Sequence, residues 1–322
     1  MQEIYKFIYR IFKFTSLQVS VLLLFLAPQI LNYEEVIYQS FLAATIDKHS
    51  LLNRQIKRRI LFVGGSAFAF GNDSSYIGEQ LNYYPINMGL HGGLGVEYQL
   101  NEVKDKLQSG DIVVLSIEYE SFIDFPPSSK EVFSVLEPRW QNIKFLPLNY
   151  IPSMLDKGLV ITGEVLRRSL ASFTGDIERK SYLRRDGFNE FGDLVAHHQL
   201  ESLAEKVSTD NKTYSFELND VRRAIKSLNY FNKIAKEKGV KVFYAYPPLL
   251  KRVLDKSRTE IRVVEKELSQ SLEFPILDKP EDVAYPENHY FDTRYHLNKI
   301  GIEKRSKHLS ERLSGHINST EK

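Results

Sequence analysis

Short apolar runs alternate with amphipathic segments along much of the chain. Ile60–Val63 and Ile112–Glu118 are runs of β-favouring residues without polar alternation, which is typical of strands buried on both faces of a parallel sheet. Between them, Val96–Gln108 repeats apolar residues at helical spacing. These patterns predict strands at Ile60–Val63, Pro85–Asn87, Ile112–Glu118, Val240–Tyr246 and Pro275–Leu277, and helices at Ser75–Leu81, Val96–Gln108, Leu218–Lys238, Asp255–Leu272 and Leu297–Leu313.

The order of these segments predicts an α/β fold with three layers, α/β/α, around a mainly parallel sheet. We expect this domain to cover residues 59–318. Residues 121–217 lack a second buried-strand pattern, so they are predicted to form a long insertion over one edge of the sheet. The insertion contains a turn at Pro126-Pro127 and a helix predicted at Gly158–Ser172.

The chain begins with a segment that could cross a membrane. Residues 14–33 carry no charge, and a membrane-spanning helix needs about 20 largely apolar residues. The positive-inside rule predicts residues 1–13 in the cytoplasm and the folded domain on the outer, periplasmic side of the inner membrane. The charges concerned are Lys6, Arg10 and Lys13 before the apolar run and Glu34 and Glu35 after it.

Two other interpretations of residues 14–33 stay open. A cleaved signal peptide has a similar charge pattern, although its apolar region is usually shorter and ends in small residues. A buried helix of a soluble domain is the other interpretation, and Gln18 and Pro28 favour it. Beyond the apolar run, residues 34–58 carry apolar side chains at mixed helical spacing and are predicted to form a helical neck.

The charge and composition exclude several kinds of protein. The 43 basic and 41 acidic residues give a formal net charge of +2, and no basic tract dominates outside the N-terminus. We therefore expect no nucleic-acid partner. The absence of cysteine excludes disulfides and thiolate chemistry.

Ser66 is the first candidate for chemistry. The strand Ile60–Val63 stops at Gly64 and Gly65, and a helix can begin at Ala67. Two glycines let the backbone turn sharply and leave the hydroxyl beside unpaired amides at a helix start, where ligands of parallel sheets collect. Ser66 is thus a candidate nucleophile, although a Gly-Gly-Ser sequence is also commonly a plain turn. The segment lacks the glycine spacing and the lysine of nucleotide-binding loops, so we expect no cofactor.

A serine nucleophile needs a base and an acid that orients the base. His296 lies just before the last predicted helix, and Asp292 precedes it by four residues. In a loop, Asp292 can accept from one ring nitrogen while the other nitrogen faces the serine. Asp292 could equally be a cap residue before the helix. His197 and His198 are adjacent and do not share a helix face, so we expect no metal site.

The order of these features resembles the SGNH (GDSL-like) hydrolase superfamily. More narrowly, it resembles the membrane-anchored, extracytoplasmic SGNH-like proteins of bacteria related to alginate and peptidoglycan O-acetyltransferases and to the lipoteichoic acid D-alanylation protein. The resemblance covers Ile60–Glu118 and Val240–Leu313. It implies an SGNH/flavodoxin-like fold in which Ser66 is the nucleophile and Asp292 and His296 are the acid and the base.

The resemblance also implies an oxyanion hole. The segment N-M-G-L-H-G places Asn87 and Gly92 on the family positions for it. The chain departs from the family where a strand usually ends in a glycine and an oxyanion-binding asparagine, because Glu118 stands there and an ionised carboxylate cannot donate. Tyr119, or Asn189 of the insertion, would then supply the missing donor. The glycine before the serine and the four-residue Asp–His spacing are further departures, since the family usually has an aspartate and a spacing of three.

Two functions follow from these observations. The first is an extracytoplasmic, membrane-anchored serine acyl-ester hydrolase or O-acyltransferase that acts on acylated cell-envelope polysaccharide or glycan. Arg184 or Arg185 would attract an anionic substrate, and a multi-pass membrane acyltransferase is the partner that the resemblance implies. The alternative is a catalytically inactive SGNH-like protein that binds glycan or scaffolds an envelope acylation complex.

Overall fold

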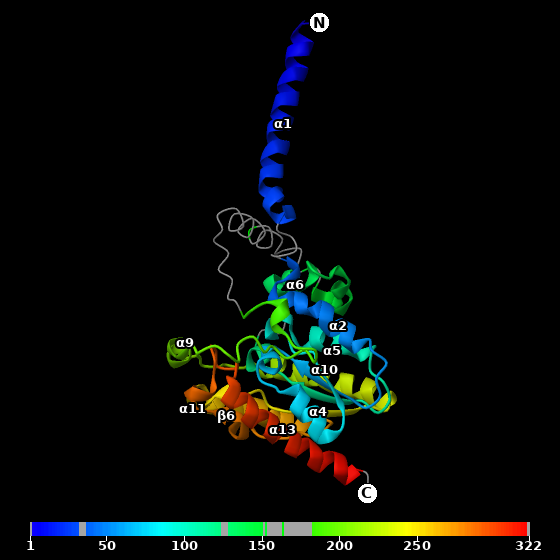
Figure 1. Ribbon diagram of the computed structural model, residues 1–322, viewed down its shortest axis with the longest axis vertical. Coiled ribbons are helices and arrows are strands. Elements are labelled where there is room, and N and C mark those ends of the chain that lie inside the picture. Colours follow the sequence, from blue (N-terminus) through cyan, green and yellow to red (C-terminus); the bar gives the residue numbers. More distant parts are fainter. Residues whose placement is uncertain are drawn as a thin grey trace.

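A four-stranded parallel sheet in the order β2-β1-β3-β4 forms the centre of the molecule (Figure 1). This computed structural model describes residues 2–31, 37–123, 128–150 and 182–320, together with Pro152 and Gly163. Leu61 pairs with both Ile86 and Val113, so the carboxyl ends of the strands meet at one edge. The strands are β1 (Arg59–Gly64), β2 (Tyr84–Asn87), β3 (Ile112–Ser116) and β4 (Lys241–Tyr244).

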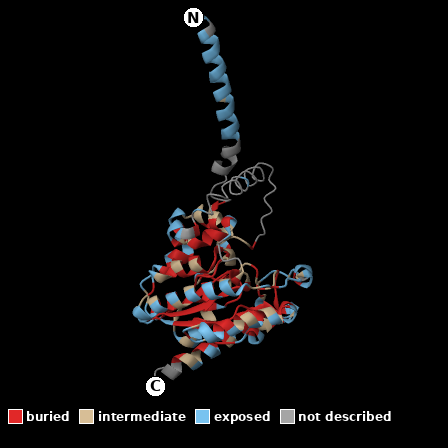
Figure 2. Ribbon diagram, turned by 180° about the vertical axis from the view of Figure 1, so that it is seen from behind, coloured by how far each residue is buried: buried red, intermediate tan, exposed pale blue. Residues whose placement is uncertain are grey.

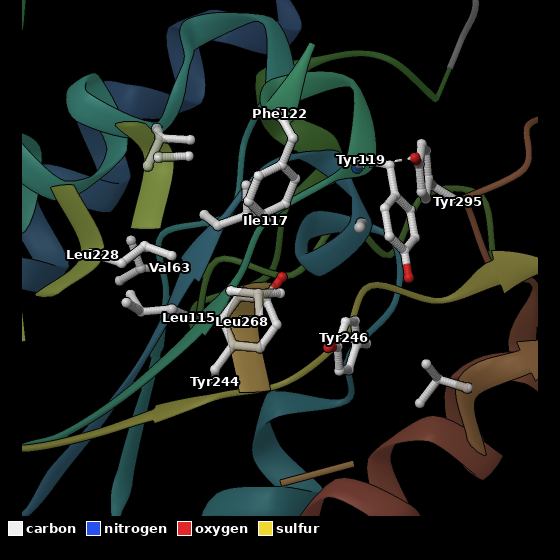
Figure 3. Packing of buried hydrophobic residues seen from close by; sticks show 14 of the residues in the cluster. Val63, Leu115, Ile117, Tyr119, Phe122, Leu228, Tyr244, Tyr246, Leu268 and Tyr295 are labelled. Atoms are coloured by element: carbon white, nitrogen blue, oxygen red, sulfur yellow. Dashed lines mark hydrogen bonds between the residues drawn. The ribbon is translucent and has the colours of Figure 1, made fainter. Parts of the chain in front are cut away.

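Helices cover both faces of the sheet, and the buried residues concentrate between the layers (Figure 2). Successive side chains of a strand point to opposite faces. Leu61 and Val63 therefore enter one core, while Ile60 and Phe62 enter the other. Figure 3 shows Val63 in the first core together with Leu228 and Leu268. The predicted three-layer α/β fold is thus confirmed. The first core is covered by α5 (Val96–Lys104), α10 (Leu218–Glu237) and α12 (Arg258–Ser271), and the second by α4 (Ser74–Leu81) and α13 (Lys299–Thr320).

One predicted helix is divided. The segment expected to be helical over Asp255–Leu272 contains two helices, α11 (Lys251–Lys256) and α12, which meet at Ser257. Ser257 has φ −110° and ψ 23°, and its buried hydroxyl accepts a hydrogen bond from the Tyr214 amide at 3.1 Å. The break that local periodicity does not predict therefore lies at a residue whose side chain contacts a distant part of the chain.

The strands that follow β4 in the chain are shorter than predicted. Pro275–Leu277, predicted as a strand, contributes a single parallel bridge between Ile276 and Tyr244. The sequence patterns did not predict the separate two-stranded ladder of β5 (Leu249–Leu250) and β6 (Ala284–Tyr285). Elements of two residues are too short to show a period.

Within the described part of the insertion, Phe191–Leu194 lie beside the carboxyl end of β2 and the turn that follows β1. The Asn87 amide at the end of β2 donates to Phe191 O (2.7 Å), and the Leu194 amide donates to Ala69 O (2.8 Å). The second contact joins the insertion to the turn that carries Ser66. The Pro126-Pro127 turn lies outside the described residues, and Gly163 is the one described residue of the helix predicted at Gly158–Ser172.

The N-terminal helix α1 (Gln2–Leu31) projects from the domain (Figure 1), and its described side chains are largely exposed (Figure 2). Its part Ile4–Leu24, 21 residues, is long and apolar enough to cross a membrane. The basic segment expected at residues 1–13 is therefore part of the same helix as the apolar run.

Residues 37–58, the described part of the predicted neck, do not form a separate neck. Within the predicted neck, η2 (Phe41–Ala44) and α2 (Thr45–Leu52) pack into the domain. Leu51 and Leu52 belong to its main core, and Lys48 is 2% exposed. The neck prediction is wrong because the apolar positions of this segment are buried in the clusters of the domain.

Candidate active site

Ser66 lies at the carboxyl end of β1, at the first residue of the short helix α3 (Ser66–Ala69). A Cβ on Gly64 would overlap the carbonyl oxygen of Ser116 on β3, so only glycine fits where the strand turns into the helix. The turn is held by a hydrogen bond from the Phe70 amide to Ser66 O at 2.9 Å. Ser66 is 9% exposed, so the serine is nearly enclosed by its neighbours.

Ser66, His296 and Asp292 form a continuous chain of hydrogen bonds. The Ser66 hydroxyl lies 2.9 Å from His296 Nε2, and His296 Nδ1 lies 2.7 Å from Asp292 Oδ1. An ionised Asp292 can only accept, so Nδ1 carries the proton and Nε2 presents its lone pair to the serine hydroxyl. The three residues predicted to lie together are therefore in contact, in the orientation needed to take a proton from Ser66.

The loop before α13 explains how a four-residue Asp–His spacing reaches this geometry. Tyr290 and Leu297 form an antiparallel bridge, and the Phe291 amide donates to His296 O at 2.8 Å. These bonds close residues 290–297 into a hairpin, which returns His296 beside Asp292. The ring of Phe70 stacks on the imidazole with a centroid distance of 3.7 Å and an interplanar angle of 3°. The imidazole is thus fixed by its ring face as well as by its nitrogens.

Tyr182 adds a fourth member that the sequence patterns did not indicate. Its hydroxyl donates to Asp292 Oδ2 at 2.9 Å, opposite the oxygen that binds the imidazole. Burial, and then the negative charge of Asp292, raise the pKa of Tyr182, so the phenol stays protonated. Tyr182 comes from the insertion, 110 residues away in sequence, and no local pattern marks it. It holds a carboxylate that is only 6% exposed.

Two backbone amides beside Ser66 are available to bind an oxyanion. Gly92 opens the short helix η3 (Gly92–Leu94), and a Cβ on Gly65 would lie 2.8 Å from Gly92 Cα. The chain therefore passes very close to the Ser66 turn at this point, which requires glycine at position 65. Within the described ranges, neither the Ser66 amide nor the Gly92 amide has a hydrogen-bond partner. Gly92 thus lies beside the Ser66 turn, and its role in an oxyanion hole stays a prediction.

Glu118 occupies the remaining side of the serine. Its Oε1 accepts from the Ala67 amide (2.7 Å) and lies 3.1 Å from Ser66 Oγ. The side chain lies just beyond β3, where the family pattern would place an asparagine. Burial is the main cause that raises the pKa of Glu118, and the charge of Glu120 raises it further, although the Ala67 amide acts in the opposite direction. The group that touches the serine here is therefore a carboxyl group, not an amide.

Asn87, Tyr119 and Asn189 do not supply the missing donor, and this part of the prediction is wrong. Both amide hydrogens of Asn87 are used, on Phe68 O (2.9 Å) and on Asp193 Oδ1 (2.6 Å). Asn189 Oδ1 accepts a hydrogen bond from the Asp193 amide (2.9 Å), and Asn189 Nδ2 donates to Asp193 Oδ2. The side chain of Asn189 is therefore bonded within its own loop. Tyr119 is 1% exposed and belongs to the main core, beside Tyr295 (Figure 3).

The remaining polar candidates have structural partners. His197 Nε2 lies 3.0 Å from Leu297 O, and burial lowers the pKa of His197 to about 3, so its ring stays neutral and donates to that carbonyl. The guanidinium groups of Arg184 and Arg185 pair with Asp186 and Asp47. In the part of the chain that the structure describes, no three histidine, aspartate or glutamate side chains are placed to hold a metal ion.

Neither a family model nor a curated protein matches this sequence. Among solved structures, an acylhydrolase-like protein from Bacteroides fragilis is similar over 84% of this chain and 94% of its own, with 11% identity and a TM-score of 0.39. An acetyl xylan esterase from Butyrivibrio proteoclasticus is similar over 82% of this chain and 65% of its own, with 10% identity and a TM-score of 0.35. These similarities are weak, and the interpretation of the site rests on its own geometry.

Proposed function

We propose that the protein is a serine acyl-ester enzyme, a hydrolase or an O-acyltransferase. The observation that carries this proposal is the chain of hydrogen bonds from Asp292 through His296 to Ser66 at the carboxyl end of the sheet. Ser66 Oγ attacks the ester carbonyl carbon, and its proton passes to His296 Nε2. The amides of Ser66 and Gly92 receive the negative oxygen of the tetrahedral intermediate.

The intermediate collapses when the carbon–oxygen bond to the leaving alcohol breaks. His296 returns its proton to that alcohol, and the acyl group remains on Ser66. Water, or the hydroxyl of a sugar, then attacks the acyl-enzyme and gives its proton to His296. Asp292 stabilises the imidazolium that forms twice in this cycle, and Tyr182 holds Asp292 in place.

The proposed substrate is an acylated polysaccharide or glycan of the cell envelope. The support for it is α1, whose apolar part Ile4–Leu24 is long enough to anchor the domain to a membrane. Lys6, Arg10 and Lys13 lie in the first half of this part and residues 14–24 carry no charge, which favours a cytoplasmic N-terminus and an extracytoplasmic domain. A multi-pass membrane acyltransferase would be a suitable partner, because it could deliver the acyl group to an enzyme held at the outer face.

A reporter fused after residue 33 tests the topology, and activity confined to the cytoplasm would contradict it.

A non-catalytic glycan-binding protein is the second candidate function. The observation that favours it is Glu118, because an ionised carboxylate 3.1 Å from Ser66 Oγ would repel an oxyanion. In that case the site would bind an acylated sugar without turning it over.

Labelling with a fluorophosphonate probe and hydrolysis of p-nitrophenyl acetate distinguish the two functions. The wild-type protein should be labelled covalently and release nitrophenolate, and Ser66→Ala should do neither. Ser269→Ala, an exposed serine on α12, is the matched control and should behave as the wild type. Turnover that persists in Ser66→Ala would show that Ser66 is not the nucleophile.

A further inference from the structure

The Glu118 side chain lies between the Ser66 turn and the Gly92 loop. Its Oε1 receives the Ala67 amide at 2.7 Å, and a Cβ on Gly92 would overlap its Oε2. Glu118 is 7% exposed. It thus fills the side of the serine that is not occupied by His296, next to the two unpartnered amides.

The protons of the triad favour a neutral Glu118. Ser66 Oγ has one proton and two neighbouring acceptors, His296 Nε2 at 2.9 Å and Glu118 Oε1 at 3.1 Å. An ionised carboxylate is a strong acceptor and would draw this proton away, leaving no proton between the serine oxygen and the lone pair of Nε2. A neutral carboxyl group accepts more weakly, so the serine proton stays on the side of His296.

The two oxygens of Glu118 have different partners. Oε1 is engaged by the Ala67 amide, whereas Oε2 accepts no hydrogen bond from any residue in the described ranges. The proton of a neutral carboxyl group therefore belongs on Oε2, the oxygen nearest Gly92. In this form Oε2–H is a hydrogen-bond donor beside Gly92.

The surroundings of Glu118 favour its protonated form. Burial raises its pKa most, and Glu120 on the same segment raises it further, while the Ala67 amide, His296 and Ser66 lower it. The Tyr295 hydroxyl donates a hydrogen bond to the Glu120 carboxylate. Arg294 Nη1 also donates to this carboxylate, at 3.2 Å. The pKa of Glu118 lies above its ordinary value after all these contributions.

We propose that Glu118 is a further catalytic residue, which acts as a neutral acid and donates Oε2–H to the oxyanion of the tetrahedral intermediate. The inference rests on the proposed function, because it assigns the third donor of that reaction. No bond of Glu118 breaks: its proton stays on Oε2 while the serine proton moves to His296. Burial of a carboxylic acid can keep it neutral for such a role at neutral pH. The rate should fall as the pH rises through the pKa of Glu118, since the ionised group cannot donate and repels the oxyanion.

Two substitutions at Glu118 test this role in p-nitrophenyl acetate hydrolysis measured from acid to alkaline pH. Glu118→Gln keeps the shape and a donor that cannot ionise, so kcat at neutral pH should stay within about tenfold of wild type and the alkaline decline should disappear. Glu118→Ala removes the donor and should lower kcat by about 10²–10³-fold. A Gln variant as slow as the Ala variant would overturn the proposal. A Gln variant more than about tenfold faster than wild type would also overturn it, because the native group would then be an ionised inhibitor.

Glu120→Gln is the matched control for the charge. It removes the neighbouring negative charge that raises the pKa of Glu118, so the alkaline decline should move to lower pH. An unchanged alkaline decline would mean that Glu118 is not the titrating group and would contradict the proposal.

A measurement that needs no turnover separates this inference from the proposed function. Infrared spectroscopy in D₂O should show the C=O stretch of a protonated carboxyl group at neutral pH, and the band should be lost in Glu118→Gln. Turnover in the wild type without this band would overturn the neutral acid alone. Absence of both turnover and fluorophosphonate labelling at Ser66 would overturn the proposed function itself.

Discussion

Replacing Asp292 by asparagine tests the proposed proton transfer most directly. The substitution keeps the size of the side chain but removes its negative charge. The new amide has two orientations: with its oxygen toward His296 Nδ1, its nitrogen donates to the Tyr182 hydroxyl, which can accept. With the nitrogen toward Nδ1, the imidazole must take the other tautomer, and Nε2–H then faces Ser66 and cannot accept its proton.

The expected loss can be calculated from the geometry. His296 Nδ1 and Asp292 Oδ1 are 2.7 Å apart, and the centres of the two charged groups lie about 4 Å apart when the imidazolium forms. At an effective dielectric constant of about 20, this pair is worth about 4 kcal/mol in the transition state and much less in the ground state, where the imidazole is neutral. Since about 1.36 kcal/mol is a factor of ten, kcat should fall by about 10³-fold, and by about 10⁴-fold if the tautomer is also lost.

The assay is p-nitrophenyl acetate hydrolysis at neutral pH, together with the rate of fluorophosphonate labelling. KM should change little, because Asp292 is buried and is bonded to His296 and Tyr182. Asp186→Asn, on an exposed aspartate that pairs with Arg184, serves as the control and should keep wild-type kcat. A folded Asp292→Asn protein that loses less than about tenfold would contradict the proposed proton transfer, because no charge would then develop on His296.

Three more substitutions have defined outcomes. Gly92→Ala places a methyl group on Glu118 Oε2 and should lower kcat by about 10²–10³-fold with KM little changed, as measured by steady-state kinetics. Tyr182→Phe removes one hydrogen bond to the triad carboxylate and should lower kcat by about tenfold, and a loss as large as that of Ser66→Ala would contradict its supporting role. Arg59→Leu leaves the carboxylate of Asp111 buried and unpaired, so urea unfolding should show a loss of about 3–5 kcal/mol, whereas an unchanged midpoint would be inconsistent with the buried ion pair.

The layers of the fold could be predicted from local patterns because strand and helix burial are periodic. Ile60 and Leu61 enter different cores, as the alternation of a strand buried on both faces requires. Where tertiary contacts override the local pattern, prediction failed. The break between α11 and α12 lies at Ser257, whose hydroxyl accepts a bond from Tyr214, 43 residues away in sequence.

The site could be predicted in part. The Gly-Gly-Ser turn indicated Ser66, and Asp292 with His296 stood at a spacing that a loop could bring together. Asn87 was wrongly expected at the oxyanion hole, because its motif does not reveal that Asp193 uses its amide. Whether a polar side chain is available to a ligand depends on partners that come from elsewhere in the chain.

Local sequence is enough to specify the buried strands, the apolar N-terminal helix and the sharp turn that ends β1 at Ser66, because each depends on residues next to one another in the chain. The chemistry around that serine depends instead on the tertiary structure. Glu118 and Tyr182 reach the triad across 52 and 110 residues of sequence, to Ser66 and to Asp292. The position of a proton depends on donors, acceptors and burial within a few ångströms, and those neighbours are set by the packing of distant segments.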